Sequence, residues 1–86
     1  MARALAYRIQ EADADGDTLS VTLSVLFYGA DLPASLSNPV TFDLGGTDTL
    51  TQMRDKAVTA VVAKGTQLGL TVARSSVVVP SLARGV

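Results

Sequence analysis

The stretch "EADADGDT", which begins at Glu11, holds the densest group of side chains that could do chemistry. Its carboxylates lie at alternating positions: Glu11, Asp13, Asp15 and Asp17. An EF-hand calcium loop places oxygen ligands at positions 1, 3, 5 and 7 and a glycine at position 6, where this stretch has Gly16. One interpretation is therefore a weak calcium site with Asp13, Asp15 and Asp17 as ligands.

The residues that follow favour a simple turn instead. Position 12 of the loop would be Thr22, which cannot replace the bidentate glutamate of an EF-hand. Leu19 and Val21 alternate with polar residues as in a strand, whereas the EF-hand needs a helix there. Asp and Gly are also the residues that turns prefer for backbone reasons. The sequence predicts a hairpin turn, with calcium binding as the weaker alternative.

Several kinds of chemistry lack the residues that they need. The chain has no His and no Cys, which removes Ser–His and Cys–His pairs and the usual zinc ligands. "DLGGTDTL" lacks the Lys-Ser/Thr ending of a phosphate-binding loop. A net charge of −1, with two Tyr, two Phe and no Trp, argues against nucleic-acid binding. No apolar run reaches about 18 residues. We expect no enzymatic activity, cofactor, small-molecule substrate, nucleic-acid partner or membrane span.

Three segments alternate apolar and polar residues, which predicts strands with one buried face. Their apolar residues are Leu5, Tyr7 and Ile9; Leu19, Val21, Leu23, Val25 and Phe27; and Val40, Phe42 and Leu44. The first two strands flank the acidic stretch and form a hairpin. Between the second and third, "GADLPASLSNP" is predicted to be a loop over residues 29–39, because Gly, Pro and Asn interrupt regular structure.

A helix is predicted over residues 50–64. Thr49 is a favourable N-cap and Gln52 completes a capping box, while Gly65 is expected to end the helix. The buried stripe comprises Leu50, Met53, Ala57, Val58, Ala60 and Val61. Arg54 falls beside this stripe, where it either lies along the apolar surface or forms an ion pair at an interface.

The C-terminal part is predicted to contain a fourth strand with Leu68, Leu70 and Val72 on one face. Residues 1–73 then form a single domain, and residues 74–86 form either an edge strand or an extended arm that pairs with a neighbouring chain. Exposed valines on a free tail would favour aggregation, so a partner surface is expected to cover them. The predicted interface residues are Arg54, Arg74, Val77, Val78, Val79, Pro80 and Leu82.

These elements predict an α+β fold: a small, mostly antiparallel sheet packed against one helix, followed by a strand and the C-terminal arm. A domain of 86 residues has a thin core, and without Cys or His the remaining reinforcement is association. Residues 1–46 carry two basic and six acidic side chains, whereas residues 47–86 carry five basic and two acidic ones. Opposite poles suit head-to-tail contacts between copies, so we expect a homo-oligomer or a larger assembly with other protein subunits.

Two segments together carry a resemblance to a group of known proteins. "ALAYRIQEADADGDTLSVTLSVLFYG" followed by "VTFDLGGTDTLTQMRDKAVTAV" resembles small structural proteins of tailed bacteriophages and phage-like particles, over about residues 4–62. The resemblance implies a non-enzymatic virion component of the head, neck or tail, made in the host cytoplasm. It assigns no function to any single residue.

A second class of function fits the same elements. A small monomeric, β-grasp-like cytoplasmic module could bind a protein or peptide through the 29–39 loop or through a sheet edge. That class predicts a monomer with a self-contained C-terminus, whereas the assembly class predicts that residues 74–86 reach another chain.

Overall fold

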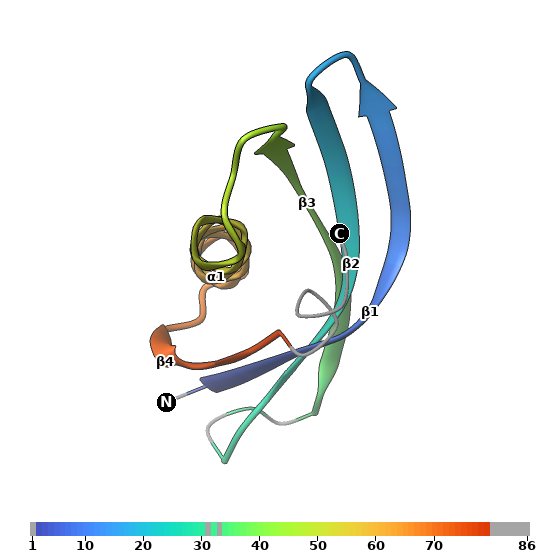
Figure 1. Ribbon diagram of the computed structural model, residues 1–86. Coiled ribbons are helices and arrows are strands. Elements are labelled where there is room, and N and C mark those ends of the chain that lie inside the picture. The colour runs from blue at the N-terminus through green and yellow to red at the C-terminus, as the bar shows by residue number, and fades with distance from the viewer. Residues whose placement is uncertain (1, 31, 33, 80–86) are drawn as a thin grey trace.

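The computed structural model describes residues 2–30, 32 and 34–79, which form one mixed sheet with a helix on one face (Figure 1). The predicted α+β class is confirmed. Its elements are β1 (Ala2–Asp15), β2 (Thr18–Tyr28), β3 (Leu36–Gly45), α1 (Leu50–Gln67) and β4 (Val72–Val78). The strand order is β3-β2-β1-β4. Neighbours are antiparallel except β4, which runs parallel to β1.

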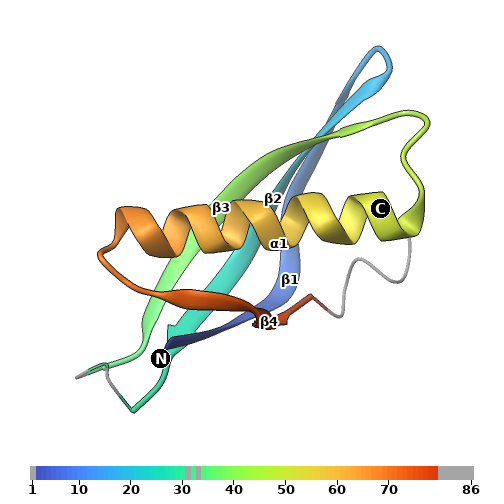
Figure 2. The ribbon, with the colours of Figure 1, turned by 90° about the vertical axis from the view of Figure 1, so that its left-hand side faces the viewer.

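The acidic stretch forms the tip of a long hairpin, as the turn prediction required. Asp15 pairs with Thr18, so that only Gly16 and Asp17 connect β1 to β2. Gly16 has a φ of 63°, a value suited to glycine at the first position of a two-residue hairpin turn. The tip extends beyond both β3 and α1 (Figure 2).

The buried face of β1 differs from the predicted one. Ala2, Ala4 and Ala6 are buried under the helix, whereas Tyr7 is exposed on the other side of the sheet. The pairing register between β1 and β2 shifts twice, between Ala6 and Arg8 and between Ile9 and Glu11. Each shift inserts one extra residue, as a β-bulge does. After the first shift Ile9 lies on the core side of the sheet, whereas Tyr7 lies on the opposite side, although both have the same parity in the sequence.

The core lies between α1 and the face of the sheet that the alanines of β1 share. β2 supplies most of its volume, with every apolar residue of its predicted face either buried or packed against the core. The sheet curves around the helix (Figure 1). The buried apolar residues are Ala2, Ala4, Ala6, Val21, Leu23, Val25, Phe27, Val40, Leu44, Ala57, Val61, Val72 and Val79.

The start of α1 was predicted correctly and its end was not. Thr49 accepts a hydrogen bond from the Gln52 backbone, and the Gln52 side chain accepts one from the Thr49 backbone, so the capping box is confirmed. The helix continues through Gly65 to Gln67 and ends where Gly69 takes a φ of 79°. Leu50, predicted in the buried stripe, is 55% exposed because it lies in the first turn, beyond the end of the core.

The outer strands also differ from the predicted limits. β3 begins at Leu36, inside the predicted loop, and includes Pro39, which an edge strand tolerates. The last strand starts at Val72; Leu68 instead caps the helix, so the strand predicted around Leu68 and Leu70 is wrong in position. The sequence suggested two separate segments here, one ending at Val72 and one at the valines that follow. In the structure they form a single edge strand of seven residues, β4.

Candidate interaction surface

The side of the sheet that faces away from α1 has no other element packed on it among the described residues; we call it the open face. Its members follow from the register, because residues paired with core residues point to the core and their neighbours point away. The open face comprises Arg3, Leu5, Tyr7, Arg8, Glu11, Asp13 and Asp15 of β1; Ser20, Thr22, Ser24, Leu26 and Tyr28 of β2; Ser37, Pro39, Thr41 and Asp43 of β3; and Val78 of β4.

One row of apolar side chains crosses three adjacent strands on this face. Leu5 of β1 pairs with Leu26 on one side and with Val78 on the other. Val78 is 49% exposed, and nearby Tyr7 is 47% exposed. We call Leu5, Leu26 and Val78 the apolar row. Leu5 and Leu26 are half-buried, so each exposes part of its side chain beside Val78. Contiguous apolar side chains on a surface mark interaction sites more often than isolated ones do.

Polar contacts fix the centre of the open face. The Arg8 Nε donates to the Ser24 Oγ at 3.3 Å, and that hydroxyl donates to the Gln10 Oε1 at 3.2 Å. Ser24 is only 6% exposed, because the two long side chains from β1 cover it. The Tyr7 hydroxyl lies 3.2 Å from the Ser37 Oγ on β3. The register shifts in β1 therefore position Tyr7, Arg8 and Gln10 over β2.

Charge on the open face changes sign along the strands. Arg3 lies at the end of β1 farthest from the hairpin turn, and Arg8 lies near the middle. The carboxylates gather toward the turn, where Asp13 and Asp43 both flank Ser20 across three strands. The remaining acidic residues of this end are Glu11 and Asp15.

The weak calcium candidate is spread over two kinds of structure. Asp13 and Asp15 belong to β1, whereas Asp17 lies in the turn. Within residues 2–30, 32 and 34–79, no group of three His, Cys, Asp or Glu side chains is arranged to hold a metal ion. The geometry of this stretch is that of a hairpin tip.

The predicted interface residues do not form a single surface. Arg54 is exposed on α1, and Arg74 contacts α1 of its own chain by donating to Asp55 and, at 2.8 Å, to the Thr59 Oγ1. β4 divides its valines between the two faces: Val77 packs against the core and Val78 joins the open face. Just beyond the strand, Val79 is 2% exposed in the core. Pro80 and Leu82 lie outside the described residues.

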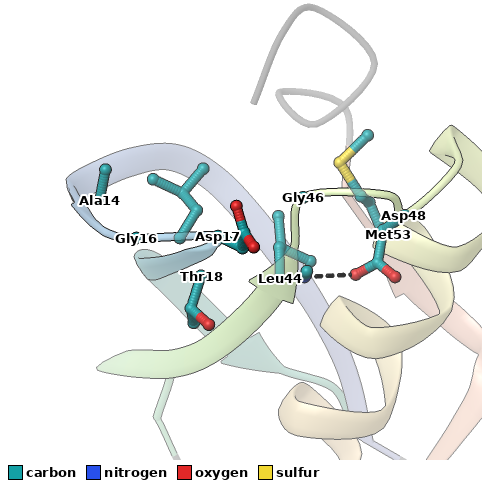
Figure 3. A pocket seen from close by; sticks show the side chains of 10 residues that line it. Ala14, Gly16, Asp17, Thr18, Leu44, Gly46, Asp48 and Met53 are labelled. Carbon is teal, nitrogen blue, oxygen red and sulfur yellow. Dashed lines mark hydrogen bonds between the residues drawn. The ribbon is translucent and has the colours of Figure 1, made fainter.

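A shallow pocket of about 340 Å³ lies between the hairpin tip, the end of β3 and the start of α1 (Figure 3). Leu44 and Met53 supply apolar lining, and Asp17 and Asp48 supply carboxylates. The Lys56 Nζ donates to Asp48 at 2.6 Å. This hydrogen bond, together with one from the Gly45 backbone at 2.7 Å, holds the pKa of Asp48 below its ordinary value of 3.8. Asp48 thus acts as a structural anion that ties the β3–α1 connection to the helix.

A second groove runs between the edge of β3 and the C-terminal half of α1. Small residues on the helix, Ala60 and Ala63, leave space beside Val40 of β3, and Lys64 lies at the same groove. An exposed strand beside a helix is the arrangement that accepts an extended peptide as an additional strand. The groove is therefore the feature that a peptide-binding module would use.

Sequence reasoning missed the open face because it assigned Leu5 and Tyr7 to the core. The signal was present in the first six residues, where Ala2, Ala4 and Ala6 also alternate. The alternation of Leu5 and Tyr7 predicts the opposite face, because large apolar side chains are more often buried than exposed.

The chain matches no family of known proteins, and no curated protein or solved structure is significantly similar to it. In the part of the chain that the structure describes, no helix has the length and apolar character needed to cross a membrane.

Proposed function

We propose that this protein is a non-enzymatic assembly subunit that is held in a larger particle by protein–protein contacts. The observation that carries the proposal is the open face, where the apolar row crosses three strands without any covering element among the described residues. A sheet can leave one face to solvent, and a row of partly exposed apolar side chains on that face offers a surface on which another subunit can pack.

Two further features support an assembly role. The core is built largely from Ala and Val, with Phe27 as its largest fully buried side chain, so association would add substantially to stability. The sequence resembles small structural proteins of tailed bacteriophages, which leads us to propose a phage or phage-like particle as the setting. We propose other protein subunits as its partners and the virion as its location.

The groove between β3 and α1 favours a second candidate function. A monomeric module could bind an extended peptide along β3, with small side chains beside Ala60 and Ala63 and an acidic group near Lys64. This candidate needs no contact through the open face.

Solution mass separates the two candidates. We expect light scattering of the full chain to give a mass above the 8.9 kDa of one copy, rising with concentration from about 10 μM to about 1 mM. Static and dynamic measurements on the same samples would distinguish defined oligomers from aggregates. A mass of one copy at every concentration would contradict self-association and favour the peptide-binding module.

A further inference from the structure

We infer that the partner of the open face is a second copy of this chain, packed face to face with its strands antiparallel to the first. The inference rests on the proposed assembly function and names the contact by which it begins. Its basis is the distribution of charge along the face, which is complementary to itself only in this orientation.

The charges on the open face form a gradient along the strands. Arg3 pairs with Tyr28 at one end, and Glu11 pairs with Thr22 toward the other. Since these β2 partners are six residues apart, Arg3 and Glu11 are separated by about 20 Å along the sheet. At that distance, and with solvent between them, the two residues of one chain are screened from one another.

A second copy turned end for end brings the opposite charges together. When a two-fold axis passes halfway between these two residues, Arg3 of each copy faces Glu11 of the other. Stacking with strands parallel would instead place carboxylates on carboxylates at the acidic end, which like-charge repulsion disfavours. The gradient therefore selects the antiparallel arrangement, which is isologous and closes as a dimer.

The same axis lies at the apolar part of the face. Halfway between Thr22 and Tyr28 on β2 is Val25, whose neighbours on the open side are Ser24 and Leu26. The half-exposed Tyr7 also lies here, beside the apolar row. On β1, Leu5 of one copy would then face Arg8 of the other, and the aliphatic part of the arginine side chain can lie along the leucine. Arg3 and Glu11 would lie at the rim, where charged residues are usual in a protein interface.

The size of the molecule sets an upper limit for the contact. The molecule extends 41 Å along its longest axis and 21 Å along the next, so a whole face approaches the roughly 800 Å² per partner of a standard interface, and two convex faces would bury the central part of it. The sheet curves around α1 and its open side is convex (Figure 1). Two convex faces touch first in the middle, at the apolar row, and the long Arg3 and Glu11 side chains span the wider gap at the ends.

Charge reversal tests the arrangement directly. R3E and E11R each replace an exposed side chain, and each would set like charges opposite one another at two symmetry-related positions. We expect either variant to weaken dimerisation at least tenfold at low salt, and the double variant R3E/E11R to return it to within about threefold of the parent. Sedimentation equilibrium would give the dissociation constants, and circular dichroism would verify that each variant is folded.

Matched controls separate this contact from a general effect of net charge. R54E makes the same change as R3E on the exposed side of α1, so it should leave dimerisation within about twofold of the parent. V78K would place a charge in the apolar row and should weaken dimerisation without rescue by either charge reversal. V78K also serves as the test if R3E fails to fold.

The outcomes distinguish the two proposals. An oligomer whose mass is insensitive to R3E, E11R and V78K would overturn the open-face dimer and leave the assembly function standing. Weakening by both single variants without recovery in R3E/E11R would overturn the antiparallel pairing. A chain that is monomeric at every concentration would overturn the dimer and the proposed self-association together.

Discussion

Gly65 lets α1 and β4 pack together without a side chain between them. A Cβ atom at this position would lie 2.9 Å from the Val72 Cγ2, closer than real side chains approach one another. The sequence suggested a helix end here, because glycine commonly follows the last helical residue. The reason for a glycine inside the last turns of the helix is its close contact with β4. This contact is tertiary, so the neighbouring residues in the sequence do not reveal it. Gly69, four residues later, takes the terminating conformation.

We predict that G65A destabilises the protein by about 1–2 kcal/mol. Overpacking costs about 1–3 kcal/mol, and the better helix propensity of alanine returns up to about 1 kcal/mol. V72A removes the clashing methyl groups and alone costs about 2 kcal/mol. In the V72A background, G65A should be neutral or stabilising, as urea denaturation of all four proteins would show. Additive effects of the two changes would contradict the close approach.

Asp48 should make stability depend on acidic pH. Since the folded state lowers the pKa of this carboxyl, its contribution is complete above the ordinary value of 3.8 and is lost as pH falls through the lower folded value. The variant D48N retains an acceptor for the Gly45 backbone but loses the ion pair with Lys56.

We therefore predict that D48N is less stable than the parent at neutral pH and that the difference shrinks below pH 3.8. Urea denaturation midpoints at several pH values would measure it. As a control, the variant D43N makes the same Asp-to-Asn change on the open face, outside the ion pair between Asp48 and Lys56. A D48N difference that stayed constant down to about pH 2 would show that the carboxylate does not titrate as described.

Among the elements, β2 was the most predictable and β1 the least. β2 alternates without interruption, and every apolar residue of its predicted face lies on the core side. β1 contains two register shifts, and each reverses the face on which the following residues lie. A bulge depends on how two strands pair, so alternation within one strand does not reveal it. The capping box of α1 is local, which is why its start could be predicted to the residue.

β4 shows a similar dependence on tertiary pairing. The valines near the end of the chain suggested either an edge strand or an arm, and the choice depends on whether β1 offers a free edge. In the structure β1 pairs with residues up to Val78, so this part of the predicted arm belongs to the sheet of its own chain. The strand propensity of these valines could be read from the sequence, but the strand with which they pair could not.

We predict that two neighbouring valines respond differently to truncation. V79A should cost about 2 kcal/mol because Val79 is only 2% exposed in the core. V78A should change the stability of the monomer by less than about 0.5 kcal/mol because that side chain faces solvent. Thermal denaturation at a concentration where the chain is monomeric would compare them. Equal effects would contradict the placement of the strand end.

At the scale of the whole molecule, the sequence shows a separation of charge between its two halves, whereas the structure shows a separation along the open face. The two halves of the chain differ in net charge, but every charged residue of the open face lies in residues 1–46, so the gradient along that face arises within the first half of the chain. Asp48 and Asp55 are absorbed in contacts with Lys56 and Arg74, whereas the acidic residues near the hairpin tip remain on the open face. Apart from Arg54 on α1, the predicted interface residues lie near the C-terminal end of the chain. The face that the described elements leave uncovered is made largely by β1 and β2.

The pairing of β4 with β1 also sets the order in which this chain can fold. The hairpin of β1 and β2 joins residues that are close in sequence, so it can form while the ribosome is still making α1. The other edge of β1 must wait for residues 72–78, almost the whole length of the chain later. Closing so long a loop is slow compared with forming a hairpin. Until it closes, the edge of β1 that later pairs with β4 is free, and a free strand edge can pair with another chain.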